Sequence, residues 1–180
     1  FYIPSLTNSV KYDRVASYFR SSVFIVNAPG IKKFIGNGGV IRMILNVKLD
    51  QNDAEAIESA NDNPESFLEK LRKNEFNHII DNIHEQRYTL LAMLIASEKL
   101  KIKISYVKGN IEHSKYGIFT DDNGDKVAFT GSINESIGAW TSQNNEFSVY
   151  CSWKDVMDKQ LDKKCKSFER LWSDSGSKAK

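Results

Sequence analysis

The sequence predicts an α/β fold in which a mixed β-sheet carries helices on both faces. The apolar patterns follow the order strand, helix, strand, helices, then mainly strands and a last helix. The run VIRMILNV (40–47) is apolar almost throughout and is bounded by turn residues, as is typical of a strand buried on both faces. The chain has 180 residues, which is enough for one domain with its own core.

The first part of the chain predicts one helix between two strands. Residues 12–19 are aromatic-rich and roughly alternating, so we expect a strand. Residues 21–36 have helical spacing, although Pro29-Gly30 should kink or divide that helix. The glycine-rich stretch 36–39 ends it, and the second strand is the apolar run 40–47.

The middle of the chain is mainly helical. Residues 48–65 are polar and acidic, and we expect part loop and part short helix there. From Phe76 to Leu94 the apolar positions recur at helical spacing, which predicts one long helix of about six turns.

The second half contains four predicted strands and a helix. Alternation or short apolar runs mark strands over 101–107, 116–120, 126–131 and 147–153. The Asn-Gly turn within 121–125 joins the second and third of these strands as a hairpin. An amphipathic helix then carries five apolar positions: Met157, Leu161, Phe168, Leu171 and Trp172. We expect a single domain over 1–173, with 174–180 a linker or tail that leads to further domains of a longer parent protein.

Composition restricts the classes of function. A net charge of +2 excludes a polybasic binder that depends on bulk charge. No stretch has the length of a membrane span, and no secretory signal is recognisable. Two cysteines and three histidines are too few for a disulfide framework or a multi-histidine metal centre, so we expect no metal and a cytoplasmic setting.

The residues that suggest chemistry lie between 111 and 149. His113 and Lys115 are two apart at the start of a predicted strand, so their side chains should project to the same side. Ser132 and Asn134 are two apart just beyond the next strand, and Glu146 opens the following one. If the strands are hairpin neighbours, all five side chains lie at one end of the sheet.

Together these groups suit metal-independent attack on a phosphodiester. Histidine is a nucleophile near neutral pH without a metal. Lysine, serine and carboxamide groups are donors for phosphoryl oxygens, and a glutamate can orient an imidazole and stabilise its positive form. We therefore expect no cofactor.

The segments HSK (113–115), GSIN (131–134) and NNE (144–146) resemble the phospholipase D superfamily. Its signature is His-x-Lys, then Asp, then Gly-Ser-x-Asn, with a later Glu. The resemblance covers roughly residues 12–153 and is greatest to single-motif nucleases, including restriction-endonuclease-like and helicase-associated domains. It implies an α-β-α sandwich. This chain has Thr120 where the family's Asp usually stands, so either Asp121 or Asp122 replaces that residue or its role is missing.

The resemblance also implies a composite site. In the family two motif copies form one site, where one histidine becomes a phosphohistidine while the other protonates the leaving oxygen and then activates water. This chain has one copy, so we expect a homodimer with one site at its interface. DNA is the expected substrate, and a fused helicase or specificity domain is a possible partner.

We therefore expect a metal-independent DNA endonuclease, the nuclease domain of a restriction or defence enzyme. Its site would consist of His113, Lys115, Ser132, Asn134 and Glu146. One alternative is a catalytically silent dimerisation or DNA-docking module, because Thr120 stands where the family usually has an Asp. Another is a phospholipid phosphodiesterase or transferase, against which the single motif and the lack of an amphipathic membrane helix argue.

Other conspicuous residues have ordinary explanations. For the three tryptophans we expect packing in the core or at a dimer interface: Trp140, Trp153 and Trp172. We expect His78 and His84 to be structural or at the surface. Four lysines could follow a phosphate backbone or simply form a solvated strand face: Lys99, Lys101, Lys103 and Lys108.

Overall fold

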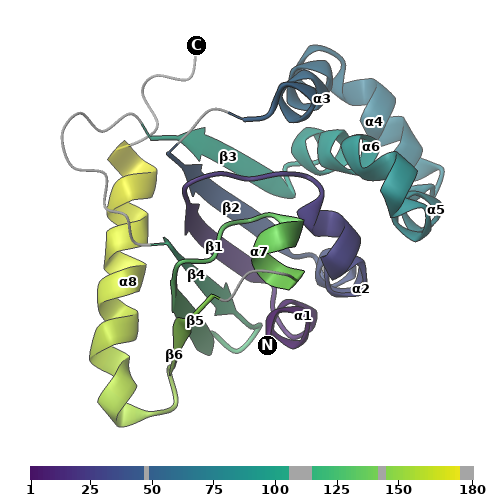
Figure 1. Ribbon diagram of the computed structural model, residues 1–180. Helices are drawn as coiled ribbons and strands as arrows, with labels where there is room; N and C mark the ends of the chain where they lie inside the picture. The colour runs from purple at the N-terminus through teal and green to yellow at the C-terminus, as the bar shows by residue number, and fades with distance from the viewer. Residues whose placement is uncertain (47–48, 106–114, 142–144, 175–180) are drawn as a thin grey trace.

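A six-stranded mixed sheet forms the centre of the molecule (Figure 1). The computed structural model describes residues 1–46, 49–105, 115–141 and 145–174. The strand order is β3-β2-β1-β4-β5-β6, in which β1, β2 and β3 run parallel and the remaining neighbours antiparallel. The strands are β1 (Lys11–Ala16), β2 (Val40–Leu45), β3 (Leu100–Ile104), β4 (Lys115–Thr120), β5 (Lys126–Gly131) and β6 (Phe147–Cys151). The predicted mixed sheet and all six predicted strands are confirmed.

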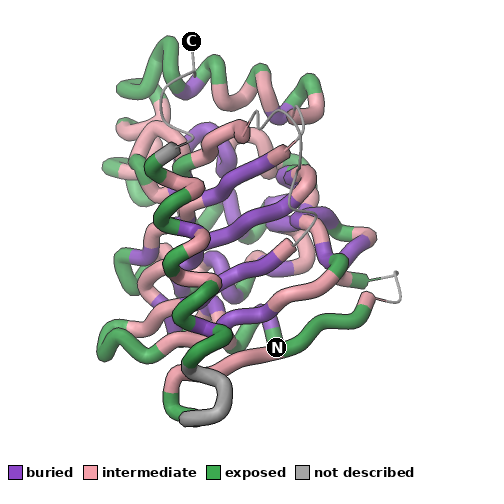
Figure 2. The backbone as a smooth tube through the Cα atoms, turned by 90° about the vertical axis from the view of Figure 1, so that its left-hand side faces the viewer, coloured by how far each residue is buried: buried purple, intermediate pink, exposed green. Residues whose placement is uncertain are grey.

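Helices cover both faces of the sheet, as the sequence predicts. The C-terminal helix α8 (Asp155–Asp174) packs on one face, where Leu161 and Phe168 meet apolar side chains of the sheet. The opposite face carries α1 (Tyr2–Thr7), α2 (Val23–Gly36), α7 (Ile137–Thr141) and a helical group that includes α6 (Ile83–Ala96) (Figure 1). Figure 2 shows buried residues concentrated in the strands, with α8 in front mainly exposed.

The middle of the chain contains more helices than predicted. Helix α3 (Gln51–Asp62) occupies most of the acidic segment 48–65, and α4 (Pro64–Arg72) follows it. Asp50 begins α3, because its side chain accepts a hydrogen bond from the backbone N–H of Asn52 (3.2 Å). Asn63 begins α4 in the same way by accepting from Ser66.

The single long helix predicted from Phe76 to Leu94 is wrong. The structure has α5 (Phe76–Asp81) and then α6, separated by Asn82 with φ −108° and ψ 35°. The Asn82 side chain donates to the carbonyl of His78 (2.8 Å), so it satisfies a group at the end of α5. Ile79, Ile80 and Ile83 are buried on either side of the break, so the apolar spacing continues through it.

Pro29 does not divide α2, which runs unbroken from Val23 to Gly36. A proline inside a helix costs about 3 kcal/mol. Beyond Pro29 the helix buries Ile31 and Phe34, and each such side chain contributes about 1.5–3 kcal/mol. Core packing therefore outweighs the lost hydrogen bond.

Four strands, β1, β2, β3 and β6, end before their predicted ends, and two short helices, α1 and α7, were not predicted. Strand β1 stops at Ala16 rather than at 19 because the backbone N–H groups beyond it bond elsewhere. Those of Ser17 and Arg20 pair with Asn134 and Glu135 from the loop after β5. In the described part of the chain, no helix is both long and apolar enough to cross a bilayer.

Candidate active site

The strand register brings most of the predicted site to one edge of the sheet. Lys115 opens β4 and pairs with Gly131, the last residue of β5. Gly131 pairs in turn with Phe147, the first residue of β6, directly after Glu146. Lys115, the loop after Gly131 and Glu146 are therefore neighbours, as predicted. His113 lies outside the described residues.

A close approach of β5 and β6 at this edge requires glycine. A Cβ atom at Gly131 would collide with the carbonyl oxygen of Glu146 and lie 2.8 Å from the Cβ of Phe147. A side chain here would push the two strands apart. Gly131 thus sets the spacing between the loop that carries Ser132 and the start of β6.

Ser132 is joined to a residue that sequence reasoning missed. Its hydroxyl donates to Oδ1 of Asn145 (2.7 Å), and Nδ2 of Asn145 donates to the carbonyl of Ala139 in α7 (3.0 Å). Asn145 therefore ties the loop after β5 to α7 and to the start of β6. Its position beside Glu146 in the NNE segment was the one available sequence signal.

Asn134 is oriented by the end of β1. Its Oδ1 accepts the backbone N–H of Ser17 (3.1 Å), and the side chain is half-buried. Because the carbonyl end of the amide is held this way, Nδ2 is the end that can donate to an anion.

A buried charge cluster lies directly behind this loop. Glu135 is fully buried and accepts hydrogen bonds from Nε of Arg14 (2.6 Å) and the hydroxyl of Tyr12 (2.8 Å) on β1, and from the hydroxyl of Tyr2 (3.2 Å) on α1. Arg14 is also fully buried and donates to the backbone carbonyls of Ile133 and Val15. Two of these hydrogen bonds to Glu135, together with the bond from Arg14 to the carbonyl of Ile133, fasten the loop to β1, and the third fastens it to α1.

The hydroxyl groups of the two tyrosines in this cluster stay protonated and therefore act as hydrogen-bond donors. Burial, and then the charge of Glu135, raise the pKa values of Tyr2 and Tyr12 well above their ordinary value. Sequence reasoning missed the cluster. Its signals were Arg14 within an apolar strand and Glu135 directly after GSIN.

Glu146 is exposed and borders an open hollow of about 600 Å³. Thr130, Gly131, Asn145 and Phe147 also line this hollow. The carboxylate therefore lies at the same end of the sheet as Lys115 and the loop after Gly131, and a charged ligand can reach it from solvent.

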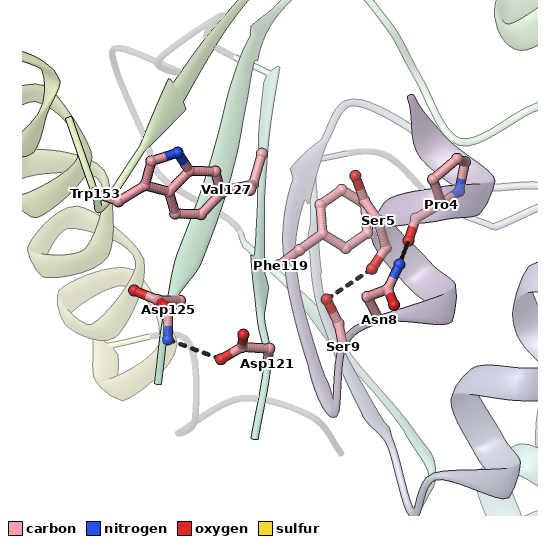
Figure 3. A pocket seen from close by; sticks show the side chains of 9 residues that line it. All are labelled: Pro4, Ser5, Asn8, Ser9, Phe119, Asp121, Asp125, Val127 and Trp153. Carbon is pink, nitrogen blue, oxygen red and sulfur yellow. Dashed lines mark hydrogen bonds between the residues drawn. The ribbon is translucent and has the colours of Figure 1, made fainter. Parts of the chain in front are cut away.

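The acidic residues after Thr120 do not belong to this site. Lys115 and Thr120 are at opposite ends of β4, about 16 Å apart at the rise of a strand. Asp121 Oδ1 accepts the backbone N–H groups of Asn123 (3.0 Å) and Asp125 (2.8 Å), so it stabilises the hairpin turn. Figure 3 shows Asp121 and Asp125 beside Phe119 and Trp153 around a different hollow, of about 260 Å³.

Two of the three tryptophans pack on other aromatic rings, and three of the four lysines donate hydrogen bonds to nearby groups. Trp140 packs on Tyr2 at 4.2 Å between ring centroids, and Trp172 stacks on Phe168 at 5.8 Å, whereas Trp153 is 59% exposed and is not a core residue. Lys99, Lys101 and Lys103 donate to Gly38, Glu98 and Trp172, respectively. Lys108 lies outside the described residues. His78 and His84 are exposed, as expected.

Comparison with known proteins gives one result for nearly the whole chain. The model of the family described as cardiolipin synthase, PLD-like domain, matches residues 2–172. No curated protein matches the chain.

Proposed function

The chain belongs to the family of phospholipase D-like domains, whose superfamily generally cleaves or transfers phosphodiesters, and from this premise we propose that it is a metal-independent DNA endonuclease. The observation that carries the proposal is the strand register: Lys115 at the start of β4, the loop after Gly131 with Ser132 and Asn134, and Glu146 just before β6 all lie at the same end of the sheet. An ammonium, a hydroxyl and a carboxamide around one space suit an anion whose charge is spread over several oxygens. We assign the enzyme to a restriction or defence system on the resemblance of its single motif alone.

In this proposal Lys115, Ser132 and Asn134 bind the oxygens of the scissile phosphate. We include His113 because of the sequence motif. It attacks phosphorus as the P–O bond to the leaving nucleotide breaks, and forms a phosphohistidine. A second histidine gives its proton to the leaving oxygen. It then takes a proton from water, whose oxygen displaces His113 from phosphorus. Glu146 orients an imidazole on the rim.

The second histidine requires a second copy of the motif. This chain carries one, so the proposal includes a homodimer with a composite site between two copies. The open edge of the sheet at Lys115 and Glu146 is the part of each copy that must face the other.

One observation favours a lipid phosphodiester as the alternative substrate. An apolar hollow of about 400 Å³ lies beside the site, and Phe147 borders both. Phe1 (42% exposed), Ile3 (37%) and Phe147 (36%) line it, so an acyl chain has apolar surface available next to the phosphate-binding edge. The description of the matching family names cardiolipin synthase, which is compatible with this alternative.

The test is cleavage of supercoiled plasmid by the purified chain in EDTA, with vesicles that contain phosphatidylglycerol as a parallel substrate. We expect nicked or linear DNA and no lipid product. Lys115→Gln should lower the cleavage rate by about 100-fold or more, since it removes a cation that meets charge developing at phosphorus.

Lys126→Gln is the matched control. Lys126 is on the same hairpin but at the opposite end of the sheet, where it pairs with Thr120, so its loss should leave cleavage unchanged. Turnover of the lipid without cleavage of DNA would favour the alternative. DNA binding without turnover of either substrate would favour a silent docking module.

A further inference from the structure

A second polar hollow begins one residue from the proposed phosphate site. Phe19 forms a β-bridge with Glu135, and the backbone N–H of Arg20 donates to the carbonyl of Glu135 (2.9 Å). Arg20 is therefore next to the residue that follows Asn134. From there the hollow, of about 250 Å³, extends between the start of α2, the start of α3 and the middle of α6. Six of its lining residues are Arg20, Ser22, Asn52, Asp53, Arg87 and Tyr88, and we call it the Asp53 hollow.

Asp53 lines this hollow, and one of its carboxylate oxygens makes no hydrogen bond among the described residues. The residue is 2% exposed, and its Oδ2 accepts the backbone N–H of Ser21 (3.0 Å). Its Oδ1 is buried without a hydrogen-bond partner among the described residues. A buried acceptor that lacks a donor costs about 1–3 kcal/mol. A ligand that offers one N–H group to this oxygen would recover that energy.

The mixed charges around the hollow disfavour a simple ion as that ligand. Arg20 is 3.8 Å from the carboxylate of Asp50, and Arg87 lies over the ring of Tyr88 at 4.4 Å and donates to its hydroxyl (2.8 Å). The two carboxylates disfavour a phosphate, and the two guanidinium groups disfavour a metal cation. A neutral group with donors and acceptors side by side fits both kinds of charge.

The size of the hollow further restricts the ligand. Pockets that enclose drug-sized ligands measure about 300–1,000 Å³, so this one has room for a smaller ligand, such as a single ring system. The edge of a nucleobase presents donors and acceptors in adjacent positions, and carboxylates accept from the amino group of cytosine.

We propose that the Asp53 hollow receives one unpaired nucleobase next to the phosphate at Asn134, and that Oδ1 of Asp53 accepts its exocyclic amino group. Cytosine and adenine carry that amino group beside a ring acceptor, whereas thymine presents a carbonyl oxygen in its place. This inference rests on the proposed function and extends it. It names unpaired DNA with an amino-bearing base beside the cleaved bond as the substrate.

The test measures binding of fluorescent dC, dA and dT 12-mers by anisotropy, in a His113→Ala background that prevents cleavage. The parent should bind the dC and dA oligonucleotides about three- to tenfold more tightly than the dT oligonucleotide, the effect of one hydrogen bond. Asp53→Asn can keep an oxygen toward Ser21 and turn its NH₂ group into the hollow. An acceptor then becomes a donor, so the preference should disappear or invert toward dT.

The controls separate this effect from folding and from stacking. Asp81→Asn makes the same chemical change on an exposed carboxylate that pairs with Lys32, and should leave the ratios unchanged. Asn52→Trp should fill the hollow from its exposed rim and abolish discrimination even if Asp53→Asn folds poorly. The base-to-base ratios of each variant are compared with those of the parent, so that intrinsic differences among the oligonucleotides cancel.

Two negative results have different meanings. If the oligonucleotides bind but Asp53→Asn and Asn52→Trp both retain the parent's ratios, the inference is wrong and the proposed function stands. If no oligonucleotide binds and plasmid is not cleaved, the proposed function fails and the inference fails with it.

Discussion

At the scale of single residues, the charge cluster around Glu135 determines where the candidate site can form. Arg14 and Glu135 are 121 positions apart in the sequence and meet with no exposure to solvent. A buried ion pair of this kind contributes modest net stability against an apolar alternative, but it is costly to break. Its position behind Asn134 indicates that it specifies the path of the loop.

Replacing Glu135 should therefore destabilise the fold strongly. Glu135→Gln leaves the Arg14 guanidinium buried without a counter-charge and turns an NH₂ group toward donors, so we expect a loss of about 3–5 kcal/mol in the free energy of unfolding. Urea denaturation followed by circular dichroism measures it. Glu169→Gln removes an exposed carboxylate that pairs with Arg42, which keeps its pair with Asp13, and should cost less than about 1 kcal/mol. Equal losses in the two variants would contradict this account.

Asp53 should make stability depend on pH. Burial raises the pKa of its carboxyl above the ordinary 3.8. The folded protein then holds this proton more tightly than the unfolded chain does, so the contribution of Asp53 to stability is full below about pH 3.8 and is lost as pH rises through the raised pKa. Asp53→Asn does not titrate.

Relative to the wild type, the stability of Asp53→Asn should therefore increase between about pH 4 and about pH 7. Denaturation midpoints of both proteins across this range measure the difference. A difference that is constant with pH, or one that decreases, would show that the carboxyl is not perturbed in this direction.

At the scale of elements, the two ends of the β4–β5 hairpin have different roles, one in the candidate site and one in stabilising the turn. Its open end places Lys115 beside Gly131, and its turn uses Asp121 to hold two backbone N–H groups. The strand length between these ends keeps the turn away from any phosphate bound at the other edge.

Asp121→Ala should accordingly affect stability and not catalysis. Loss of the turn contacts should lower the free energy of unfolding by about 1 kcal/mol, while the rate of plasmid cleavage stays within about twofold of wild type. Thermal unfolding and a cleavage time course on the same preparation check both effects. Abolished cleavage in a folded Asp121→Ala protein would place the carboxylate in the chemistry after all.

At the scale of the whole molecule, the proposed composite site predicts a particular response to mixing. If one site needs a motif from each of two copies, a dimer with one His113→Ala copy is inactive. After subunit exchange, an equal mixture of wild type and His113→Ala should retain about one quarter of the activity, since one quarter of the dimers are fully wild type. Independent monomers would retain about half. Plasmid cleavage against the mixing ratio, with sedimentation to measure mass, distinguishes the two.

The sequence by itself determined the strands, the two-faced sheet and the motif residues, because each is encoded in short-range spacing. Alternation marks β3, short apolar runs mark β4 and β5, and the hairpin turn between these two implies that Lys115 and Ser132 are neighbours. Only the tertiary structure decided the break at Asn82, the role of Asp121, and the partners of Glu135 and Asp53. Those features depend on which segments meet across the fold: Glu135 meets residues more than a hundred positions away, and the helical spacing through Asn82 is the same whether the helix continues or stops.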